Sequence, residues 1–298
     1  MLVTATVKPF PADFSDITIA DTVFGAKRET VAQTVPEHVI TAHITPDDDR
    51  VYGVAELIKI KFSENIPDDG KSQTAHAFVV VGQDKTVPPG EWAFVSDDTM
   101  VWRTENFLPA HTTLAVGHMP LTDGFVYENS SGKYKVAEEP VVTVKIGREM
   151  LTSVDADNHV ATVRIDGDTV RTMGVSTGQP GYETRSGTKV TGEKYDTIRM
   201  TSASVNISDF YDLDVPYAVR LTDSGEFMHS APWNPNIGSA NTSRGCTNLT
   251  LDDGAWFYRE AIEGDPVVTT GTSRQMGTAD TNGGAWNYTW EQWKTKTA

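Results

Sequence analysis

Short runs of alternating apolar and polar residues, closed by turn-forming clusters, restrict the first half of this chain to β structure. Alternation with a period of two places one face of a strand against a core. Clusters such as ENIPDDGKS and LTDGF separate the runs and are typical of turns. No stretch of this half predicts a helix, so we expect an immunoglobulin-like β-sandwich over residues 39–148. The runs lie at 38–44, 54–62, 75–82, 112–119 and 140–146.

The length of 298 residues suits two domains rather than one. A boundary is expected near Glu149–Ser153, and beyond it Asp166-Gly167 between two strand-like runs predicts a tight hairpin. The first 38 residues are an N-terminal segment or linker, and they can equally belong to another module. The expected division is therefore 1–38, a sandwich at 39–148, a second mostly β domain at 149–272, and a C-terminal tail at 273–298.

The net charge of −16 excludes one class of partner. So acidic a chain is repelled by phosphate backbones, which argues against nucleic acid. The charge serves solubility or, alternatively, attracts cationic partners. No apolar run of about 18 residues predicts a transmembrane segment. The opening MLVTATVKPFPADF does not resemble a signal peptide, so the protein is either cytosolic or exported by a segment outside this sequence.

Cys246 is the only cysteine, which excludes an internal disulfide and a cysteine-rich zinc site. His229 lies seventeen positions earlier, at the end of the strand-like run GEFMHS, and the intervening loop is rich in turn formers. A thiolate attacks carbonyls, and a histidine within hydrogen-bond reach can take the thiol proton. Gly245 permits a backbone angle that would aim successive N–H groups at an oxyanion. The alternative is an inert buried cysteine.

The clearest helix follows this cysteine. A Thr-x-x-Asp capping box at 250–253 precedes GAWFYREAI. Ala255, Tyr258 and Ile262 are spaced to form one apolar face, and Gly264 can close the helix.

The tail NGGAWNYTWEQWKTKTA carries four large aromatic residues, which are costly to expose. We therefore expect the tail to pack on a domain; the alternative is a platform on which carbohydrate stacks. The four are Trp286, Tyr288, Trp290 and Trp293.

The segments HSAPW at 229–233 and NTSRGCTN at 241–248 resemble the catalytic signature of the L,D-transpeptidases, a histidine followed by Ser-x-Gly-Cys-x-Asn. DDGAWFYREAIEGDPVVTT and NYTWEQW are similar to the ends of actinobacterial members, as is the order of an immunoglobulin-like module before a catalytic domain. The resemblance covers most of 40–298. It implies a mixed-β catalytic domain of the YkuD type with a prominent helix after the nucleophile.

The resemblance also implies the reaction. Cys246 would attack a meso-diaminopimelyl carbonyl in a donor stem peptide of peptidoglycan and expel D-alanine, with His229 as base and then acid. An acceptor amine would resolve the thioester into a 3→3 cross-link, without cofactor or metal. Carbapenems, as β-lactam mimics of the donor, would acylate Cys246. The substrate implies export to the cell envelope, with an anchor or signal outside this sequence.

The family pattern assigns further residues. The amides of Gly245 and Cys246 would bind the oxyanion, and Ser230 and Asn248 would support the loop and the histidine. Other matching positions belong to the nucleophile loop or line the substrate path, and they are Ser243, Met200, Tyr211 and Trp233.

Two departures from the pattern affect the predicted substrate path. Arg244 stands where many relatives have histidine. Its positive charge would either lower the pKa of the Cys246 thiol or recruit a substrate carboxylate. The alternative is that the Arg244 side chain faces outward. The segment 201–211 is shorter than the corresponding lid, with Val205 where an aromatic is common.

Two alternatives remain at this stage. Water could resolve the same thioester, which would make the protein an L,D-carboxypeptidase. The protein could also be a non-catalytic binder of the cell wall through its sandwich and its aromatic tail.

Overall fold

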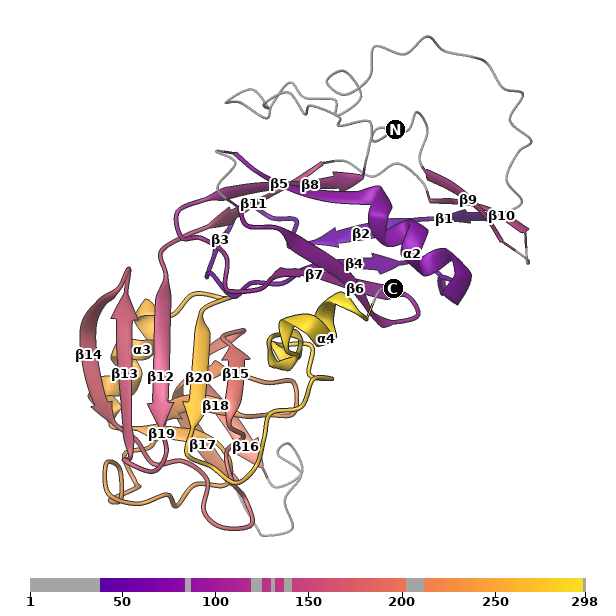
Figure 1. The fold of residues 1–298 in the computed structure, drawn as a ribbon. Coiled ribbons are helices and arrows are strands. Elements are labelled where there is room, and N and C mark those ends of the chain that lie inside the picture. The colour runs from indigo at the N-terminus through magenta and orange to yellow at the C-terminus, as the bar shows by residue number, and fades with distance from the viewer. Residues whose placement is uncertain are drawn as a thin grey trace.

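A computed structural model describes residues 38–83, 87–118, 125–129, 132–136, 141–201 and 212–296. Two β-rich parts follow one another along the chain (Figure 1). We call residues 38–146 the N-terminal sandwich, 150–270 the C-terminal module and 273–296 the C-terminal tail. The mostly β fold predicted from the alternation is confirmed.

The N-terminal sandwich is built from two four-stranded sheets and one smaller sheet. The four-stranded sheets have the orders β2-β4-β7-β6 and β3-β11-β8-β5, and the small sheet has the order β1-β10-β9. Ile60 and Trp102 from one large sheet share a buried core with Val116 and Val144 from the other, which confirms the immunoglobulin-like sandwich. The strands are β1 (His38–Ile40), β2 (Ala42–Thr45), β3 (Val51–Tyr52), β4 (Ile58–Phe62), β5 (Phe78–Gly82), β6 (Gly90–Ser96), β7 (Thr99–Thr104), β8 (Thr113–His118), β9 (Phe125–Asn129), β10 (Gly132–Val136) and β11 (Val142–Ile146).

The sandwich also holds a helix, α2 (Asp68–Ala77), where the sequence predicts a turn followed by a strand. That prediction was wrong because the turn-like Asp-Asp-Gly forms the first helical turn, where two carboxylates favour the positive end of the helix dipole. The buried residues of α2 are small, Gly70, Thr74, Ala75 and Ala77, so the helix lacks the bulky apolar stripe that would reveal it.

The C-terminal module contains a five-stranded sheet of order β14-β13-β12-β20-β15 and a four-stranded sheet of order β16-β17-β18-β19. The pairs β12–β20 and β18–β19 are parallel and the others antiparallel, so the predicted mixed-β character is confirmed. Asp166 and Gly167 have φ of 49° and 90°, which suits the predicted tight hairpin. The strands are β12 (Met150–Asp155), β13 (Val160–Ile165), β14 (Asp168–Gly174), β15 (Gly187–Val190), β16 (Lys194–Thr201), β17 (Asp212–Arg220), β18 (Phe227–Ser230), β19 (Thr247–Leu249) and β20 (Pro266–Thr270).

The predicted helix after the cysteine is α3 (Leu251–Glu260), and the Thr250 hydroxyl caps it by accepting the Asp253 N–H at 3.2 Å. The helix ends before Gly264, because Ala261 already adopts an extended conformation. Its buried face also differs from the predicted one: Gly254 and Phe257 are buried on it.

Gly254 explains this orientation of α3. A Cβ atom at this position would lie 2.0 Å from the Ser230 hydroxyl oxygen. The first turn of α3 therefore rests directly on the end of β18, and a side chain at position 254 would push the helix away from that strand.

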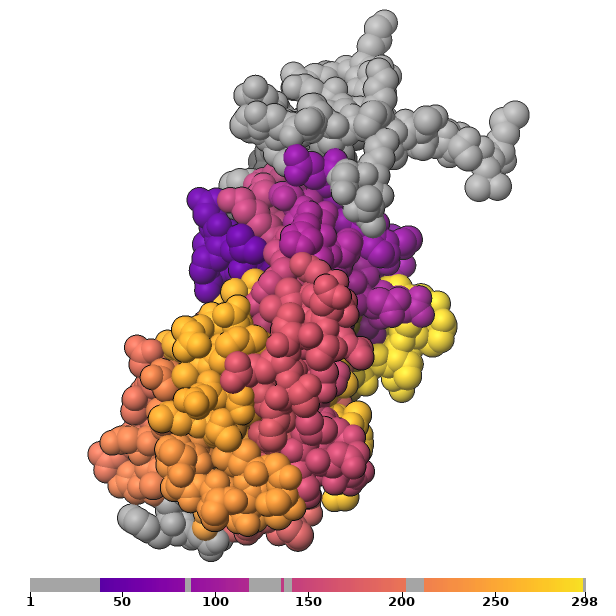
Figure 2. All heavy atoms as spheres, turned by 90° about the vertical axis from the view of Figure 1, so that its left-hand side faces the viewer, coloured from indigo at the N-terminus to yellow at the C-terminus, as the bar shows by residue number. Residues whose placement is uncertain are grey.

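The C-terminal tail packs against the N-terminal sandwich (Figure 2). It contains η2 (Gly284–Asn287) and α4 (Trp290–Lys294). The indole N–H groups of Trp286 and Trp293 donate to the Ala55 and Glu91 carbonyls at 2.8 and 2.9 Å. Trp293 is fully buried and Trp286 is 9% exposed, so these two rings are not open to a stacking sugar.

Among the described residues, none of the helices has the length and apolar character needed to cross a lipid bilayer.

Candidate functional site

The register of two parallel strands brings Cys246 and His229 together. His229 on β18 pairs with Asn248 on β19, and Cys246 directly precedes β19. Cys246 therefore lies one strand spacing across from His229 and two residues along the chain from its partner Asn248. At about 3.3 Å per residue and about 4.8 Å between strands, the Cα atoms of Cys246 and His229 are separated by roughly 8 Å.

A pocket of about 740 Å³ surrounds this pair. It gathers the predicted site residues Met200, His229, Trp233, Ser243, Arg244, Gly245, Cys246 and Asn248. Ser230 lies behind the wall, where its fully buried hydroxyl donates to the Leu251 carbonyl at 3.3 Å. Tyr211, Val205 and nearly all of the predicted lid lie outside the described residues.

The His229 ring is held in one tautomer. Its Nδ1–H donates to the Ser230 carbonyl at 2.8 Å, so Nε2 carries the lone pair of the ring. Nε2 accepts the Asn248 amide N–H at 3.0 Å. The ring is 2% exposed, and this burial lowers the His229 pKa to about 4. The imidazole is therefore neutral at neutral pH.

Trp233 covers the His229 ring from the pocket side of β18. The two rings are stacked with centroids 6.3 Å apart and planes inclined by 28°. Trp233 is 44% exposed, so its outer part is open to a bound molecule.

Cys246 is partly buried, with its sulfur 3.8 Å from the Gly225 carbonyl oxygen. Burial raises the pKa of the thiol to about 12. The group is therefore a thiol at neutral pH and requires a base or a positive charge to react as a thiolate.

The turn before Cys246 depends on Gly245, whose φ is +115°. Its N–H donates to the Ser243 hydroxyl at 3.1 Å, and that hydroxyl donates to the Cys246 carbonyl at 2.5 Å. The Gly245 amide, expected to bind an oxyanion, is therefore engaged by Ser243, which must release it before the amide can bind an anion.

Replacing Gly245 with alanine is expected to lower the free energy of unfolding by about 1–2 kcal/mol, because the positive φ disfavours a side chain. Gly277→Ala is the control, since a Cβ there meets nothing within 4 Å, and its effect should stay below about 0.5 kcal/mol. Urea unfolding of both variants checks this, and equal losses would contradict it.

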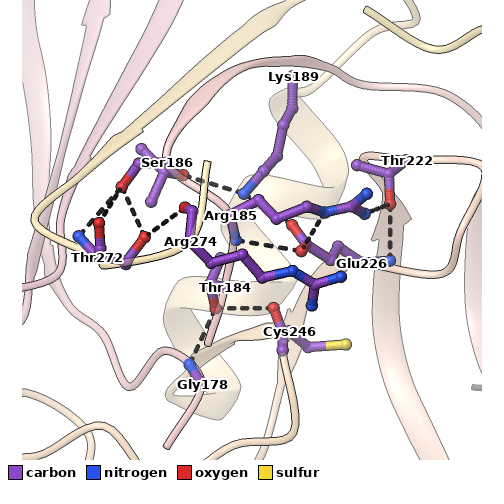
Figure 3. A network of polar contacts seen from close by, with 12 residues as sticks. Gly178, Thr184, Arg185, Ser186, Lys189, Thr222, Glu226, Cys246, Thr272 and Arg274 are labelled. Carbon is purple, nitrogen blue, oxygen red and sulfur yellow. Dashed lines mark hydrogen bonds and ion pairs between the residues drawn. The ribbon is translucent and has the colours of Figure 1, made fainter. Parts of the chain in front are cut away.

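Thr184 braces the nucleophile loop from outside, a contact that the sequence analysis missed. Its hydroxyl donates to the Gly245 carbonyl at 2.7 Å and accepts the Gly178 N–H at 2.9 Å (Figure 3). Asn241 adds a second brace by accepting the Thr177 N–H at 3.0 Å. Threonine and asparagine are common in loops, so nothing in the sequence distinguishes these two residues.

A buried cluster of charges beside Cys246 was also missed. The Glu226 carboxylate is held between Arg185 and Lys189, with N–O distances of 2.8 Å to each (Figure 3). Lys189 is fully buried and Glu226 is 6% exposed. The sequence offered one clue to this cluster. Lys189 lies in a strand-like segment, and Glu226 directly precedes the strand that carries His229.

Further charged residues reach the rim of the pocket. They are Arg244 from the nucleophile loop, Arg274 from the C-terminal tail and Asp212 from β17. Arg244 is exposed and lines the pocket, and its role there stays a prediction. Within the described ranges, no three His, Cys, Asp or Glu side chains gather as a metal site requires.

Comparison with known proteins follows the two-part architecture. Residues 151–269 match the L,D-transpeptidase catalytic domain, and residues 19–122 match a bacterial Ig domain. L,D-transpeptidase 2 of Mycobacterium tuberculosis is 32% identical over 278 residues, which are 90% of this chain and 65% of that protein. This chain thus spans just under two thirds of that relative.

Two further matches cover a larger share of the matched protein. L,D-transpeptidase 1 of Mycobacterium tuberculosis is 31% identical over 235 residues, 77% of this chain and 84% of that protein. The solved structure of the L,D-transpeptidase LdtMt1 in complex with imipenem is similar with a TM-score of 0.64 and 27% identity, over 76% of this chain and 97% of that one. The chain therefore belongs to the L,D-transpeptidase family.

Proposed function

We propose that this protein is a peptidoglycan L,D-transpeptidase in which Cys246 is the nucleophile and His229 is its base. The observation that carries the proposal is the pairing of β18 with β19, which brings both side chains into one pocket. Family membership and the imipenem complex of a similar structure support it.

The proposed reaction has two halves. The Cys246 sulfur bonds to the carbonyl carbon of a diaminopimelyl residue in a donor stem peptide, while His229 Nε2 takes the thiol proton. The carbon–nitrogen bond then breaks, and His229 returns the proton to the amine of the departing D-alanine. In the second half, an acceptor amine attacks the thioester and gives its proton to His229. The carbon–sulfur bond breaks as His229 returns this proton to the sulfur, which leaves a 3→3 cross-link and restores the Cys246 thiol.

The surrounding residues have supporting roles in this proposal. The Ser230 carbonyl fixes the tautomer that leaves Nε2 basic, and Asn248 orients the ring. The Cys246 and Gly245 amides stabilise the oxyanion once Ser243 releases the latter. Met200 and Trp233 form walls of the substrate path. Tyr211 stays a prediction.

The proposal extends to partners and location. Peptidoglycan lies outside the cytoplasmic membrane, so we infer an exported protein of the cell envelope. Carbapenems are its expected inhibitors, as acyl donors for Cys246. We also retain the division into a sandwich at 39–148, a catalytic domain at 149–272 and a tail from 273 as the working description.

An intact-mass measurement after incubation with imipenem tests the proposed chemistry. We expect wild type to gain one covalent adduct and Cys246→Ala to gain none. If wild type gains no adduct, or if the adduct persists in Cys246→Ala, then Cys246 is not the nucleophile. Incubation with disaccharide tetrapeptides then tests the reaction class, because cross-linked dimers indicate transfer to an amine and tripeptides alone indicate hydrolysis.

A further inference from the structure

The Arg185–Glu226–Lys189 triad is an unusual group to find beside a thiol. Two cations share one carboxylate, so the triad carries one net positive charge. Lys189 reaches it from β15, whereas Glu226 directly precedes β18, the strand that carries His229. The side chains of Lys189 and Glu226 are 0% and 8% exposed, and that of Arg185 is 12% exposed.

Stability alone does not explain the triad. Burying charges carries a large desolvation cost, and well-packed apolar residues in their place are often as stable or more stable. The cost is evident at Lys189, where burial lowers the pKa of the ammonium group while the Glu226 carboxylate raises it. Arg185 also donates to the Thr222 hydroxyl at 3.0 Å and to Ser224, which ties the triad to the loop before β18.

The triad adjoins the reactive sulfur. Arg185 and Glu226 line the same pocket as Cys246, and the sulfur lies against the carbonyl of Gly225, the residue before Glu226. Figure 3 shows Lys189 and Arg185 close to Glu226, with Arg274 and then Cys246 drawn below them. Charges that are buried, as these are, are weakly screened by water, so they act on a neighbouring thiol more strongly than surface charges would.

We propose that the triad is a positioning and electrostatic device for Cys246, in which Lys189 and Arg185 stabilise the thiolate and Glu226 holds both cations in place while moderating their effect. This inference rests on the proposed function, because it assigns a purpose to the ionisation of Cys246. Burial is the main influence on the thiol pKa and raises it; Glu226 raises it further and Lys189 lowers it.

Other titratable and charged groups line the same pocket as the sulfur and must be held constant in a test. They are His229 on β18, Arg244 in the nucleophile loop, Arg274 in the tail and Asp212 on β17. Since His229 is neutral near pH 7, its contribution there does not change with small changes of pH.

The test is the second-order rate of alkylation of Cys246 by iodoacetamide at pH 7.5, a reaction that needs the thiolate but no cell-wall substrate. Glu226→Gln removes the anion and should raise the rate by about three- to tenfold. Lys189→Met removes a cation and should lower it by a similar factor. The double variant Lys189→Met/Glu226→Gln keeps the net charge of the triad, so its rate should return to within about twofold of wild type.

The two single variants should change the alkylation rate in opposite directions. This separates an electrostatic role of the triad from a structural one. A purely structural triad would lower the melting temperature in both single variants and move both alkylation rates in the same direction or not at all, and either outcome overturns the proposal. Lys189→Arg, which keeps the charge, should leave the rate near that of wild type. If Lys189→Met does not fold, Glu226→Gln and the double variant still decide.

A partly buried ion pair away from the pocket provides the matched control. Arg148 and Asp265 are 3.0 Å apart and neither lines the pocket. Asp265→Asn should affect stability without changing the alkylation rate. The imipenem adduct is measured in parallel on wild type, so a failure of the proposed function would appear there, whereas a failure of the triad proposal would appear only in the alkylation rates.

Discussion

Alanine in place of His229 is expected to slow the acylation of Cys246 by imipenem by about 10²- to 10⁴-fold, the usual contribution of a positioned general base. The effect is large because the thiol pKa of about 12 leaves almost no thiolate at neutral pH. The His229 Nε2 lone pair is the nearby base, and Asn248, whose amide N–H it accepts, must release it before it takes the thiol proton. Time-resolved intact mass gives the acylation rate directly.

Asn248→Ala is the informative companion to this variant. It removes the amide that orients Nε2 but leaves the imidazole and its bond to the Ser230 carbonyl. Its loss in acylation rate should therefore be clearly smaller than that of His229→Ala. If His229→Ala acylates within about threefold of wild type, the ring is not the base.

The pH dependence follows from the same two groups. Burial lowers the His229 pKa to about 4 and raises the Cys246 pKa to about 12, so the resting pair is neutral rather than an imidazolium–thiolate ion pair. The base form of a group with a lowered pKa persists to more acidic pH. Acylation by imipenem should therefore persist down to about pH 5 and fall as the pH approaches 4. A loss of rate centred near pH 6.5, the ordinary histidine value, would contradict this arrangement.

The predicted site was accessible from sequence for a specific physical reason. Cys246 and His229 lie at strand ends joined by a loop of turn formers, and parallel pairing of such strands aligns them. The His/Gly-Cys spacing therefore encodes two residues that line one pocket. The hairpin at Asp166-Gly167 was equally predictable, because its positive φ angles require such residues.

Other features depend on tertiary packing, which a single sequence does not display. The buried side of α3 is set by the fit of Gly254 against Ser230 and not by the most hydrophobic stripe. The helix α2 has small buried residues and a turn-like start, so local pattern and structure disagree there. Lys189 and Glu226 were not singled out from the sequence, because only the folded chain shows that they meet in the interior.

Trp293→Ala is expected to lower the free energy of unfolding by about 3–5 kcal/mol, the range for truncating a fully buried tryptophan. Trp293 packs in a cluster with Leu57 and Val101 of the sandwich and Val190 of the C-terminal module. The Arg103 guanidinium lies 5.1 Å from its ring centroid, so the substitution also removes a cation–π contact. Chemical unfolding, monitored by the circular dichroism of the backbone rather than by tryptophan fluorescence, measures the loss of stability.

Trp290→Ala is the matched control, since it truncates the same residue type in the same helix. Trp290 is only partly buried, although Arg103 also lies 5.5 Å from its ring centroid. Its cost should therefore be clearly smaller, and equal losses would show that burial of Trp293 is not what anchors the tail. The same tail brings Arg274 to the rim of the pocket. Releasing α4 should thus also change the pocket wall, whereas Trp290→Ala should leave imipenem acylation near the wild-type rate.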